Sequence, residues 1–299
     1  MTSTLPTIKD YEIIELLGSG SFGNVYKVKK GGTYYAVKEV TFEEGEDVDS
    51  LRHFEVFIIE LNNLLRMKGK EHIVQLADAF IGDSLNYDQL LKVDFFGHDF
   101  VDIWHGHVID RKGYLVLNFF QGSSIESCYI PAEKSIRLYV DIADVILDFN
   151  SEGYVHGDIK GPNLLYNTET NDFCIVDLGA MCQKGNNVEM CVGNTPPIYE
   201  VPDVKQKGFD PLSYNFDFLD SYAYGVLLYV IISKMYPFVK LLDKNFPMDM
   251  ITSPTLQEDL ILLNSGNEEL DSIVMDLISY DPNDRITLQK ARDRLYCLM

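Results

Sequence analysis

The chain has 299 residues, of which 46% are apolar and 24% charged, a composition typical of folded globular proteins and unlike collagen or disordered chains. Its 46 Asp and Glu residues outnumber its 25 Lys and Arg residues and give a formal net charge of −21. This charge argues against nucleic-acid binding and against docking on an anionic membrane, because both need clustered basic side chains.

The cysteines and the N-terminus predict an intracellular protein. The cysteines are widely spaced without a C-x-x-C pair, so free thiols are expected at Cys128, Cys174, Cys182, Cys191 and Cys297. The first residues lack the basic start and apolar stretch of a signal peptide. The longest uncharged apolar stretch, residues 221–233, is shorter than the roughly 20 residues that span a bilayer. The sequence therefore predicts a cytoplasmic or nuclear location without membrane contact.

The first part of the chain is predicted to be rich in strands. After an N-terminal extension, residues 1–10, alternating apolar and polar residues over 11–40 predict three antiparallel strands joined by glycine turns. Apolar residues at intervals of three and four predict a helix over 51–67. Two more strands, 73–80 and 114–120, flank an aromatic and acidic stretch, 81–113, which we interpret as a folded insertion.

The character of the sequence changes to helical after a turn at residues 121–124. Helical spacing occurs over 134–151, 217–234, 255–263, 268–279 and 287–298. The outline is a small β-rich lobe over 11–120, a hinge turn at 121–124, and a larger, mainly helical lobe over 125–299.

A glycine-rich run lies between the first two predicted strands. It reads Gly18-Ser19-Gly20-Ser21-Phe22-Gly23-Asn24-Val25, a G-x-G-x-x-G-x-V pattern. A strand follows it, whereas a dinucleotide-binding turn needs a helix N-terminus at that point. Glycines let the backbone of a hairpin close over phosphates, and an ordinary glycine-rich hairpin is the alternative.

More motifs follow this run in a fixed order. They are Tyr35-Ala36-Val37-Lys38, then Glu60 in the predicted helix, His156-Gly157-Asp158-Ile159-Lys160-Gly161-Pro162-Asn163-Leu164-Leu165, and Ile175-Val176-Asp177-Leu178-Gly179. Their order and spacing resemble the eukaryotic-type protein kinase family. Further likeness at residues 199–203, 220–226 and 281–287 extends the resemblance over about 11–298. It implies an α+β, two-lobed kinase fold, with one main helix beside the small antiparallel sheet.

The resemblance also implies roles for individual residues. Asp158 would orient the substrate hydroxyl, and Lys160 would neutralise the transferred phosphate. Lys38 would hold the α- and β-phosphates and pair with Glu60, or with Glu55 as the alternative. His156 is expected to be a packed core histidine and not a base.

The resemblance implies ATP and a divalent metal as well. Asn163 and Asp177 would ligate Mg²⁺, with Mn²⁺ as the alternative metal. The residues implied to bind ATP are Leu17, Gly18, Ser19, Gly20, Ser21, Phe22, Gly23, Val25, Ala36, Lys38, Leu117, Asn118, Phe120 and Leu165.

The sequence departs from the family pattern at several positions. Gly157 stands where most members have Arg, and residues 178–194 contain no Ser, Thr or Tyr, so control by activation-loop phosphorylation is not expected. Asp203 replaces a Glu, so its ion pair with Arg285 must form with one methylene fewer. An extra proline leaves open whether Thr195 is the substrate-side threonine.

The predicted function is an ATP-dependent serine/threonine protein kinase, because Lys160 and Pro162 resemble the serine/threonine branch. The alternatives are a pseudokinase that acts as a protein-binding scaffold and a small-molecule kinase. Residues 121–299 carry 13 basic and 27 acidic residues. A solvated acidic surface is the commoner explanation of this excess, and a preference for basic protein partners is the alternative. Another alternative is a metal site of His98, His105 and His107 in the insertion.

Overall fold

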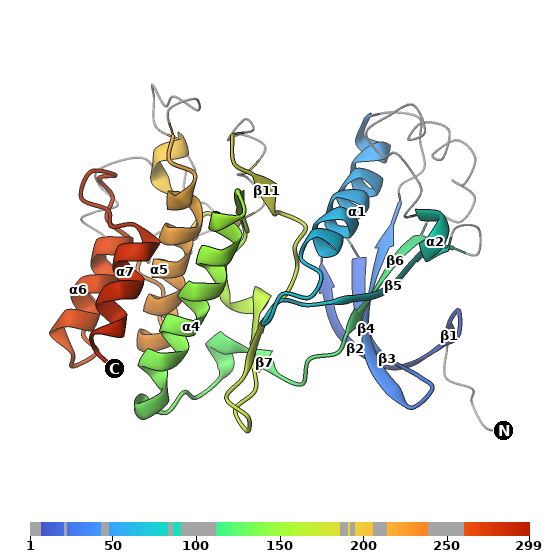
Figure 1. Cartoon of the computed structure of the whole chain (residues 1–299), viewed down its shortest axis with the longest axis horizontal. Coiled ribbons are helices and arrows are strands. Elements are labelled where there is room, and N and C mark those ends of the chain that lie inside the picture. Colours follow the sequence, from blue (N-terminus) through green and yellow to red (C-terminus); the bar gives the residue numbers. More distant parts are fainter. Residues whose placement is uncertain are drawn as a thin grey trace. The chain divides into compact units, whose positions relative to one another are not determined.

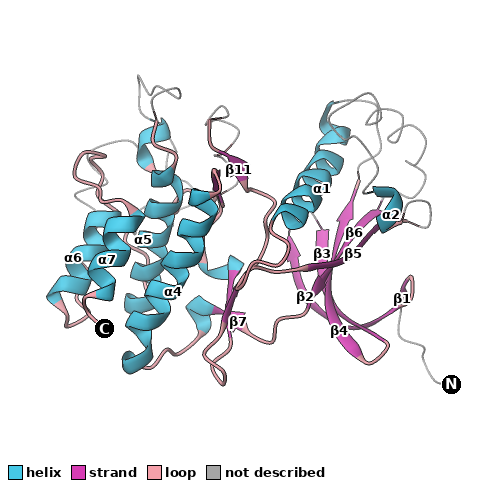
Figure 2. Cartoon of the chain, in the orientation of Figure 1, coloured by secondary structure: helices cyan, strands magenta, loops and turns pink. Residues whose placement is uncertain are grey.

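The computed structural model describes most of the chain, namely residues 7–20, 23–42, 48–82, 86–90, 112–185, 191, 195–205, 214–238 and 260–299. The chain divides into two compact units, residues 1–121 and residues 122–299 (Figure 1). Among the described residues, strands dominate the first unit and helices the second (Figure 2).

The first unit is built on a six-stranded antiparallel sheet with the strand order β1-β2-β3-β4-β6-β5. Its strands are β1 (Thr7–Ile8), β2 (Tyr11–Gly20), β3 (Gly23–Lys30), β4 (Thr33–Thr41), β5 (Leu76–Ile81) and β6 (Lys112–Asn118). The strands predicted over 11–40, 73–80 and 114–120 are confirmed, with shifts of up to three residues at the ends of the last two.

Strand β1 lies in the stretch that the sequence assigns to an N-terminal extension. Thr7 pairs with Glu12, and Ile8 pairs with Tyr11. Ile8 is only 7% exposed and belongs to the core of the unit. A two-residue strand is too short to show an alternating pattern, so the sequence gives no signal for it.

The predicted long helix is α1 (Val48–Arg66), which packs against β4, β5 and β6. The insertion over 81–113 contains one short helix, α2 (Tyr87–Leu90). Residues 83–85 and 91–111, which include His98, His105 and His107, lie outside the described residues. The prediction of a folded insertion, and the histidine alternative, therefore fall mostly outside them.

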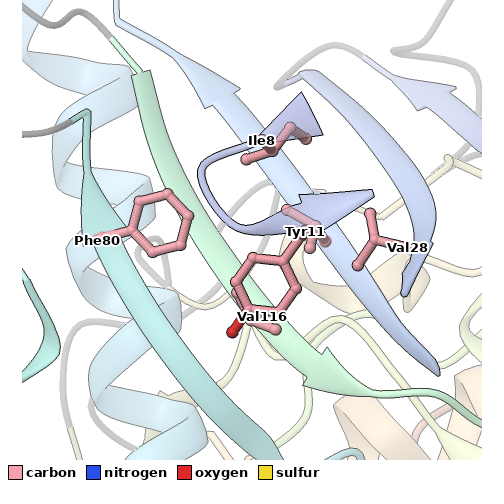
Figure 3. Close-up of a cluster of buried hydrophobic side chains, with 6 residues drawn as sticks. Ile8, Tyr11, Val28, Phe80 and Val116 are labelled. Carbon is pink, nitrogen blue, oxygen red and sulfur yellow. The ribbon is translucent and has the colours of Figure 1, made fainter. Parts of the chain in front are cut away.

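An apolar core lies on one face of this sheet (Figure 3). Its buried members are Ile8, Tyr11, Val28, Val37, Phe80 and Val116. The Tyr11 and Phe80 rings stack with centroids 6.4 Å apart, and the Tyr11 hydroxyl donates to Asp78 Oδ2 at 3.1 Å. Because side chains alternate along a strand, the neighbours of Val37 on β4 point to the opposite face.

The described residues of the second unit form short strands, turns and four helices. The short elements are β7 (Ser123–Ser124), η2 (Ile125–Ser127), β8 (Tyr154–Val155), η3 (Gly161–Asn163), β9 (Leu164–Tyr166), β10 (Phe173–Ile175), β11 (Cys182–Gln183) and η5 (Pro202–Lys205). The helices are α4 (Ala132–Ser151), α5 (Asp217–Ser233), α6 (Glu268–Leu277) and α7 (Leu288–Tyr296). They correspond to four of the five predicted helices.

Helix α5 is the centre of this unit. It packs against α4, α6 and α7, and every residue from Leu219 to Ile231 is buried. A helix that is apolar on all sides is expected to be buried in this way. No helix in the described part of the chain is long and apolar enough to cross a membrane.

The prediction of a helix over 255–263 is wrong for residues 260–263, the part of this range that the structure describes. Residues 255–259 lie outside the described residues, and residues 260–263 are not helical. Leu260 instead forms an isolated bridge with Phe238, and the Ile261 amide donates to the Pro237 carbonyl at 3.0 Å. Pairing with the segment after α5 satisfies this backbone, so it does not need helical hydrogen bonds.

The expectation of five free thiols is also wrong, because Cys182 and Cys191 form a disulfide. Cys128, Cys174 and Cys297 are free. The two bonded cysteines are nine positions apart with Cα atoms 5.6 Å apart, within the range that a disulfide can bridge. The spacing of Cys182 and Cys191 matches no C-x-x-C pattern, so their pairing is evident only from the structure.

Candidate active site

One group of predicted site residues is built on an ion pair on the sheet of the first unit. Lys38 lies on β4 next to Val37, and its side chain therefore leaves the sheet on the face opposite the apolar core. Its Nζ lies 2.7 Å from Oε2 of Glu60 on α1. Glu60 is only 1% exposed, whereas the alternative partner Glu55 is exposed. The two charges can remain buried because each compensates the other.

The strand register gathers further predicted nucleotide residues on the Lys38 face. Val25 on β3 is paired with Lys38, and Leu117 on β6 is paired with Ala36, which lies two positions before Lys38. Paired residues share a face of a sheet, as do residues two positions apart on a strand. Val25, Ala36, Lys38 and Leu117 therefore form one surface. Leu17, at a bulge in β2, is 45% exposed.

The described residues of the glycine-rich run lie at the paired ends of β2 and β3. Ser19 is paired with Asn24, and its hydroxyl donates to Asn24 Oδ1 at 2.7 Å. A side chain at Gly23 would collide with the Glu39 carbonyl on β4, so the close approach of strands explains this glycine. A Cβ at Gly18 or Gly20 would meet nothing within 4 Å. Packing within the protein therefore does not explain these two glycines.

Some predicted nucleotide residues lie elsewhere or outside the described ranges. Ser21 and Phe22 are not described. Asn118 ends β6 with an exposed side chain, and its amide donates to the Gln75 carbonyl at 2.9 Å. Phe120 is partly buried in the first unit. Leu165 lies in the second unit, on β9, where it is paired with Cys174 and Ser124.

Another group of predicted site residues lies in the second unit and surrounds Asp158, which is 6% exposed. Lys160 Nζ lies 2.7 Å from its Oδ2. Asn163 Nδ2 donates to the same oxygen at 2.7 Å and to the Asp158 carbonyl at 2.9 Å. Burial raises the pKa of the Asp158 carboxyl, and the Lys160 hydrogen bond opposes this rise. Oδ1 of Asp158 is buried without a hydrogen-bond partner among the described residues.

Asn163 and Asp177, the predicted metal ligands, both lie in this unit. The Val176 amide donates to the Asn163 carbonyl at 2.8 Å and so holds the start of the Asp177 segment beside η3. The Nδ2 group of Asn163 donates its hydrogen bonds to Asp158, and Oδ1 of Asn163 can act as an acceptor for another group. Asp177 has φ +62° and accepts the Gly179 amide on Oδ1 at 3.3 Å. Carboxylate and amide oxygens suit Mg²⁺, so these residues fit the predicted metal.

Within the described ranges, no group of three or more His, Cys, Asp or Glu residues could hold a metal ion. Two protein ligands are common for Mg²⁺, which takes the rest of its ligands from water and substrate phosphates.

Asp220 holds the backbone that leads to Asp158, a role that the sequence motifs do not reveal. It is fully buried at the start of α5, and its Oδ2 and Oδ1 accept the amides of His156 and Gly157 at 2.8 and 3.0 Å. Burial raises the pKa of Asp220 to about 6. His156 is fully buried, and burial lowers its pKa to about 4, so it is neutral at pH 7.

Glu126 is a second site residue that the sequence analysis misses. It lies in η2, and its Oε1 accepts the Tyr199 hydroxyl at 2.5 Å and the Gly161 amide at 3.2 Å. A side chain at Gly161 would collide with the Glu126 carboxyl group, so Glu126 can keep this position only beside a glycine. Burial and the Glu126 hydrogen bond raise the pKa of Tyr199. The motif spacing could not show this contact, because Glu126 lies 35 positions before Gly161.

The predicted ion pair between Asp203 and Arg285 is present in spite of the shorter side chain. Arg285 Nη1 and Nη2 lie 2.6 and 3.1 Å from Asp203 Oδ2 and Oδ1, a two-point contact. The Thr195 hydroxyl donates to the Gly157 carbonyl at 2.5 Å. Thr195 is thus held beside the Asp158 loop, and the extra proline after it does not separate them.

Comparison with known proteins agrees with this arrangement. Residues 11–297 match the protein kinase domain family model. The chain therefore belongs to the protein kinase domain family.

Individual relatives are distant. Serine/threonine-protein kinase ArnS of Sulfolobus acidocaldarius is 23% identical over 322 residues, which cover 93% of this chain and 48% of that protein. Calcium-dependent protein kinase 26 of Arabidopsis thaliana is 27% identical over 245 residues, which cover 78% of this chain and 43% of that protein. The chain thus spans about half the length of these curated relatives.

A solved structure shares the fold. The Cydia pomonella granulovirus kinase PK-1 superposes with a TM-score of 0.67 at 19% identity, and the match covers 96% of this chain and 92% of the viral one. The predicted α+β protein kinase fold is confirmed.

Proposed function

We propose that the chain is a serine/threonine protein kinase that transfers the γ-phosphate of ATP to protein hydroxyls. The arrangement around Asp158 carries this proposal. Lys160 and Asn163 occupy one carboxylate oxygen, and the buried Oδ1 has no partner among the described residues. A substrate hydroxyl can donate to that oxygen and thereby satisfy an acceptor that no described residue satisfies.

The proposed reaction uses the residues of both units. The substrate hydroxyl oxygen attacks the γ-phosphorus, the bond from that phosphorus to its bridging oxygen breaks, and ADP leaves. Asp158 accepts the hydroxyl proton, and the Lys160 ammonium neutralises charge on the transferred group. Lys38, held by Glu60, binds the α- and β-phosphates.

The nucleotide side of the proposal is supported by the first unit. The open space around Gly18 and Gly20 lets a phosphate approach the β2–β3 backbone, where a Cβ would otherwise lie in its path. The Val25, Ala36 and Leu117 surface beside Lys38 is suited to an apolar adenine ring.

Asn163 and Asp177 are the proposed Mg²⁺ ligands. Bound Mg²⁺ would neutralise the negative charge that develops on the phosphate oxygens. The protein contributes the orientation of the two ligands, through the Val176 amide and through the Asn163 hydrogen bonds to Asp158.

The proposal is tested by ADP formation from Mg-ATP and a generic protein substrate. Lys38→Met removes the ammonium and keeps the length of the side chain. We expect it to lower ADP formation at least about 10²-fold, the usual loss when one electrostatic contact to a developing charge is removed. The matched control is Lys68→Met, at an exposed lysine of the same unit, which should behave as wild type. Absence of ADP formation in wild type would favour the pseudokinase scaffold, and equal turnover in wild type and Lys38→Met would contradict the role of Lys38. Phosphotyrosine in the product would contradict serine/threonine specificity.

We further infer that activity does not depend on activation-loop phosphorylation. Gly157 offers no cationic side chain to bind a phosphate, and residues 178–194 contain no hydroxyl to carry one. The same preparation should therefore retain its activity after phosphatase treatment. A large loss of activity that maps to this segment would contradict the inference. An intracellular location stays a prediction.

We also propose that the kinase prefers protein substrates with a basic residue near the acceptor hydroxyl, and the surroundings of Glu126 support this preference. Its carboxylate is only partly buried, and its hydrogen bonds within the described residues both end on Oε1. Lys234 contacts the main-chain carbonyls of Glu126 and Cys128 with its Nζ. The second carboxylate oxygen can therefore pair with a cationic substrate residue near the Asp158 loop.

Replacing Glu126 with glutamine tests this preference, because glutamine keeps an oxygen for Tyr199 and Gly161 and removes the charge. We expect kcat/KM for a peptide with Arg or Lys near the acceptor to fall about 10-fold, the value of one charge-assisted hydrogen bond. The same peptide with Gln in place of the basic residue should be unaffected. Glu169→Gln, at an exposed acid of the same unit, is the control. An equal loss for both peptides would remove the basic preference.

A further inference from the structure

The Cys182–Cys191 disulfide lies between Asp177 and Thr195, in the segment that has no phosphate acceptor. The bond covalently joins two positions of this segment that both lie against the loop of Asp158. The contacts at each end show what the bond connects.

Cys182 is fixed to the strand that precedes Asp158. It lies on β11 and is paired with Val155 on β8, while Gln183 is paired with Tyr154. The Lys184 amide donates to the Gly153 carbonyl at 2.8 Å, and Lys184 Nζ contacts Asn150 and Asp217. This end of the bond is therefore held by backbone pairing and by helices α4 and α5.

Cys191 lies at the other side of the same loop. It is 4% exposed and lines a small cavity together with Gly157, Thr195 and Tyr199. Gly157 has φ +75°, and a Cβ built on it would lie 2.6 Å from the Ala180 carbonyl oxygen and 3.5 Å from that of Cys191. Cys191 therefore lies close to Gly157, the position at which the family pattern has an arginine.

We propose that Cys182 and Cys191 are a reversible redox site that controls this kinase, with the disulfide form as the active form. The bond would hold Cys191 against Gly157 and thereby support the backbone that presents Asp158. It would take the place of the phosphate and arginine contact that this chain lacks. The effect on catalysis rests on the proposed function, whereas the effect on the Asp158 loop does not.

The chemistry needs a small-molecule disulfide such as oxidised glutathione. One cysteine thiolate attacks it, forms a mixed disulfide and releases one thiolate. The second cysteine thiolate then attacks the sulfur of the first cysteine, forms the Cys182–Cys191 bond and releases the second thiolate. Two electrons pass to the small-molecule disulfide, and the two protons lost by the cysteines end on the two released thiols. Reduced glutathione reverses both steps.

The other cysteines are poor candidates for the same role. Cys128 and Cys174 are both free, and burial raises the pKa of Cys174 to about 12, so its reactive thiolate is scarce at pH 7. Cys297 is exposed, follows α7 and serves as the matched control. In an intracellular setting, a disulfide is usually transient, catalytic or redox-sensing.

The test places the full chain in buffers that range from reduced to oxidised glutathione. Alkylation and mass spectrometry report the bond, hydrogen–deuterium exchange of peptides covering 154–158 reports the Asp158 loop, and ADP formation reports turnover. We expect reduction to speed exchange in that loop and to lower kcat about 5-fold or more, the lower end for coupling between two sites. Cys182→Ser/Cys191→Ser should resemble the reduced protein under all conditions, and Cys297→Ser should respond as wild type does.

Three outcomes would overturn the proposal. They are a bond that does not form at any glutathione ratio, a bond that forms without changing exchange in 154–158, and a redox response that survives in the double variant. A change in exchange and turnover on reduction of the wild-type chain supports the proposal even if the double variant fails to fold. If the reduced, oxidised and variant proteins all fail to form ADP, the proposed function is wrong. The hydrogen–deuterium exchange measurement still tests whether the Cys182–Cys191 bond affects the Asp158 loop.

Discussion

Replacing Asp158 with asparagine is expected to lower the kcat of phosphoryl transfer by a factor of about 10² to 10⁴, the usual contribution of a positioned acid or base. The asparagine has nearly the same shape as the aspartate and cannot accept the substrate proton. Its amide group would also meet Lys160 Nζ or Asn163 Nδ2, both of which now donate to Oδ2. A donor facing a donor would move the side chain away from its present position.

The measurement is steady-state ADP formation with the protein substrate at saturation, together with the thermal unfolding midpoint. A nearly unchanged midpoint shows that the loss is chemical and not a loss of folding. The control is Asp148→Asn, at an exposed aspartate on α4, which should retain wild-type turnover. Wild-type turnover in Asp158→Asn would refute the assignment of Asp158 as the group that takes the proton.

Replacing Asp203 with alanine is expected to lower the free energy of unfolding by about 3 to 5 kcal/mol, because it leaves a buried cation without its partner. The Arg285 side chain is 0% exposed. Its Nε and Nη2 donate to the Ser279 carbonyl at 3.0 and 2.8 Å, and the guanidinium also lies over the Phe218 and Tyr222 rings. These contacts hold the guanidinium in place, so it cannot turn towards water when Asp203 is removed.

Urea denaturation followed by circular dichroism measures this loss. Asp203→Glu restores the charge and the residue that most of the family has, but its extra methylene should cost about 1 to 3 kcal/mol in this packed site. Asp141→Ala breaks the exposed pair with Arg137 on α4 and should have no measurable effect. A loss of less than about 1 kcal/mol in Asp203→Ala would show that the buried pair is not needed for stability.

Much of the fold follows from local sequence patterns. The alternation of β2, β3 and β4 and the apolar spacing of α1, α4, α6 and α7 are visible in the sequence, because each element buries one face. The β1 strand and the bridge between Phe238 and Leu260 are not visible, since each involves too few residues to show a period.

Some residues of the candidate site can likewise be predicted from the sequence, whereas others are found only from the structure. Lys38, Asp158, Asn163 and Asp177 are found from motif spacing, because phosphate and metal chemistry restricts the residue types at these positions. Glu126 and the Cys182–Cys191 bond are found only from the structure. Glu126 is an ordinary acid in the sequence, and it reaches the Asp158 loop only because Gly161 leaves room for it.

Steric crowding at Gly157 limits how control by activation-loop phosphorylation could arise in this chain. The residue has a left-handed backbone, and the Ala180 carbonyl occupies the space where a side chain would begin. A single mutation to arginine would therefore strain the backbone before it could offer a charge to a phosphate. A descendant of this chain could acquire phosphorylation control only if the segment around Ala180 moved first, with a phosphate acceptor and an arginine arising afterwards.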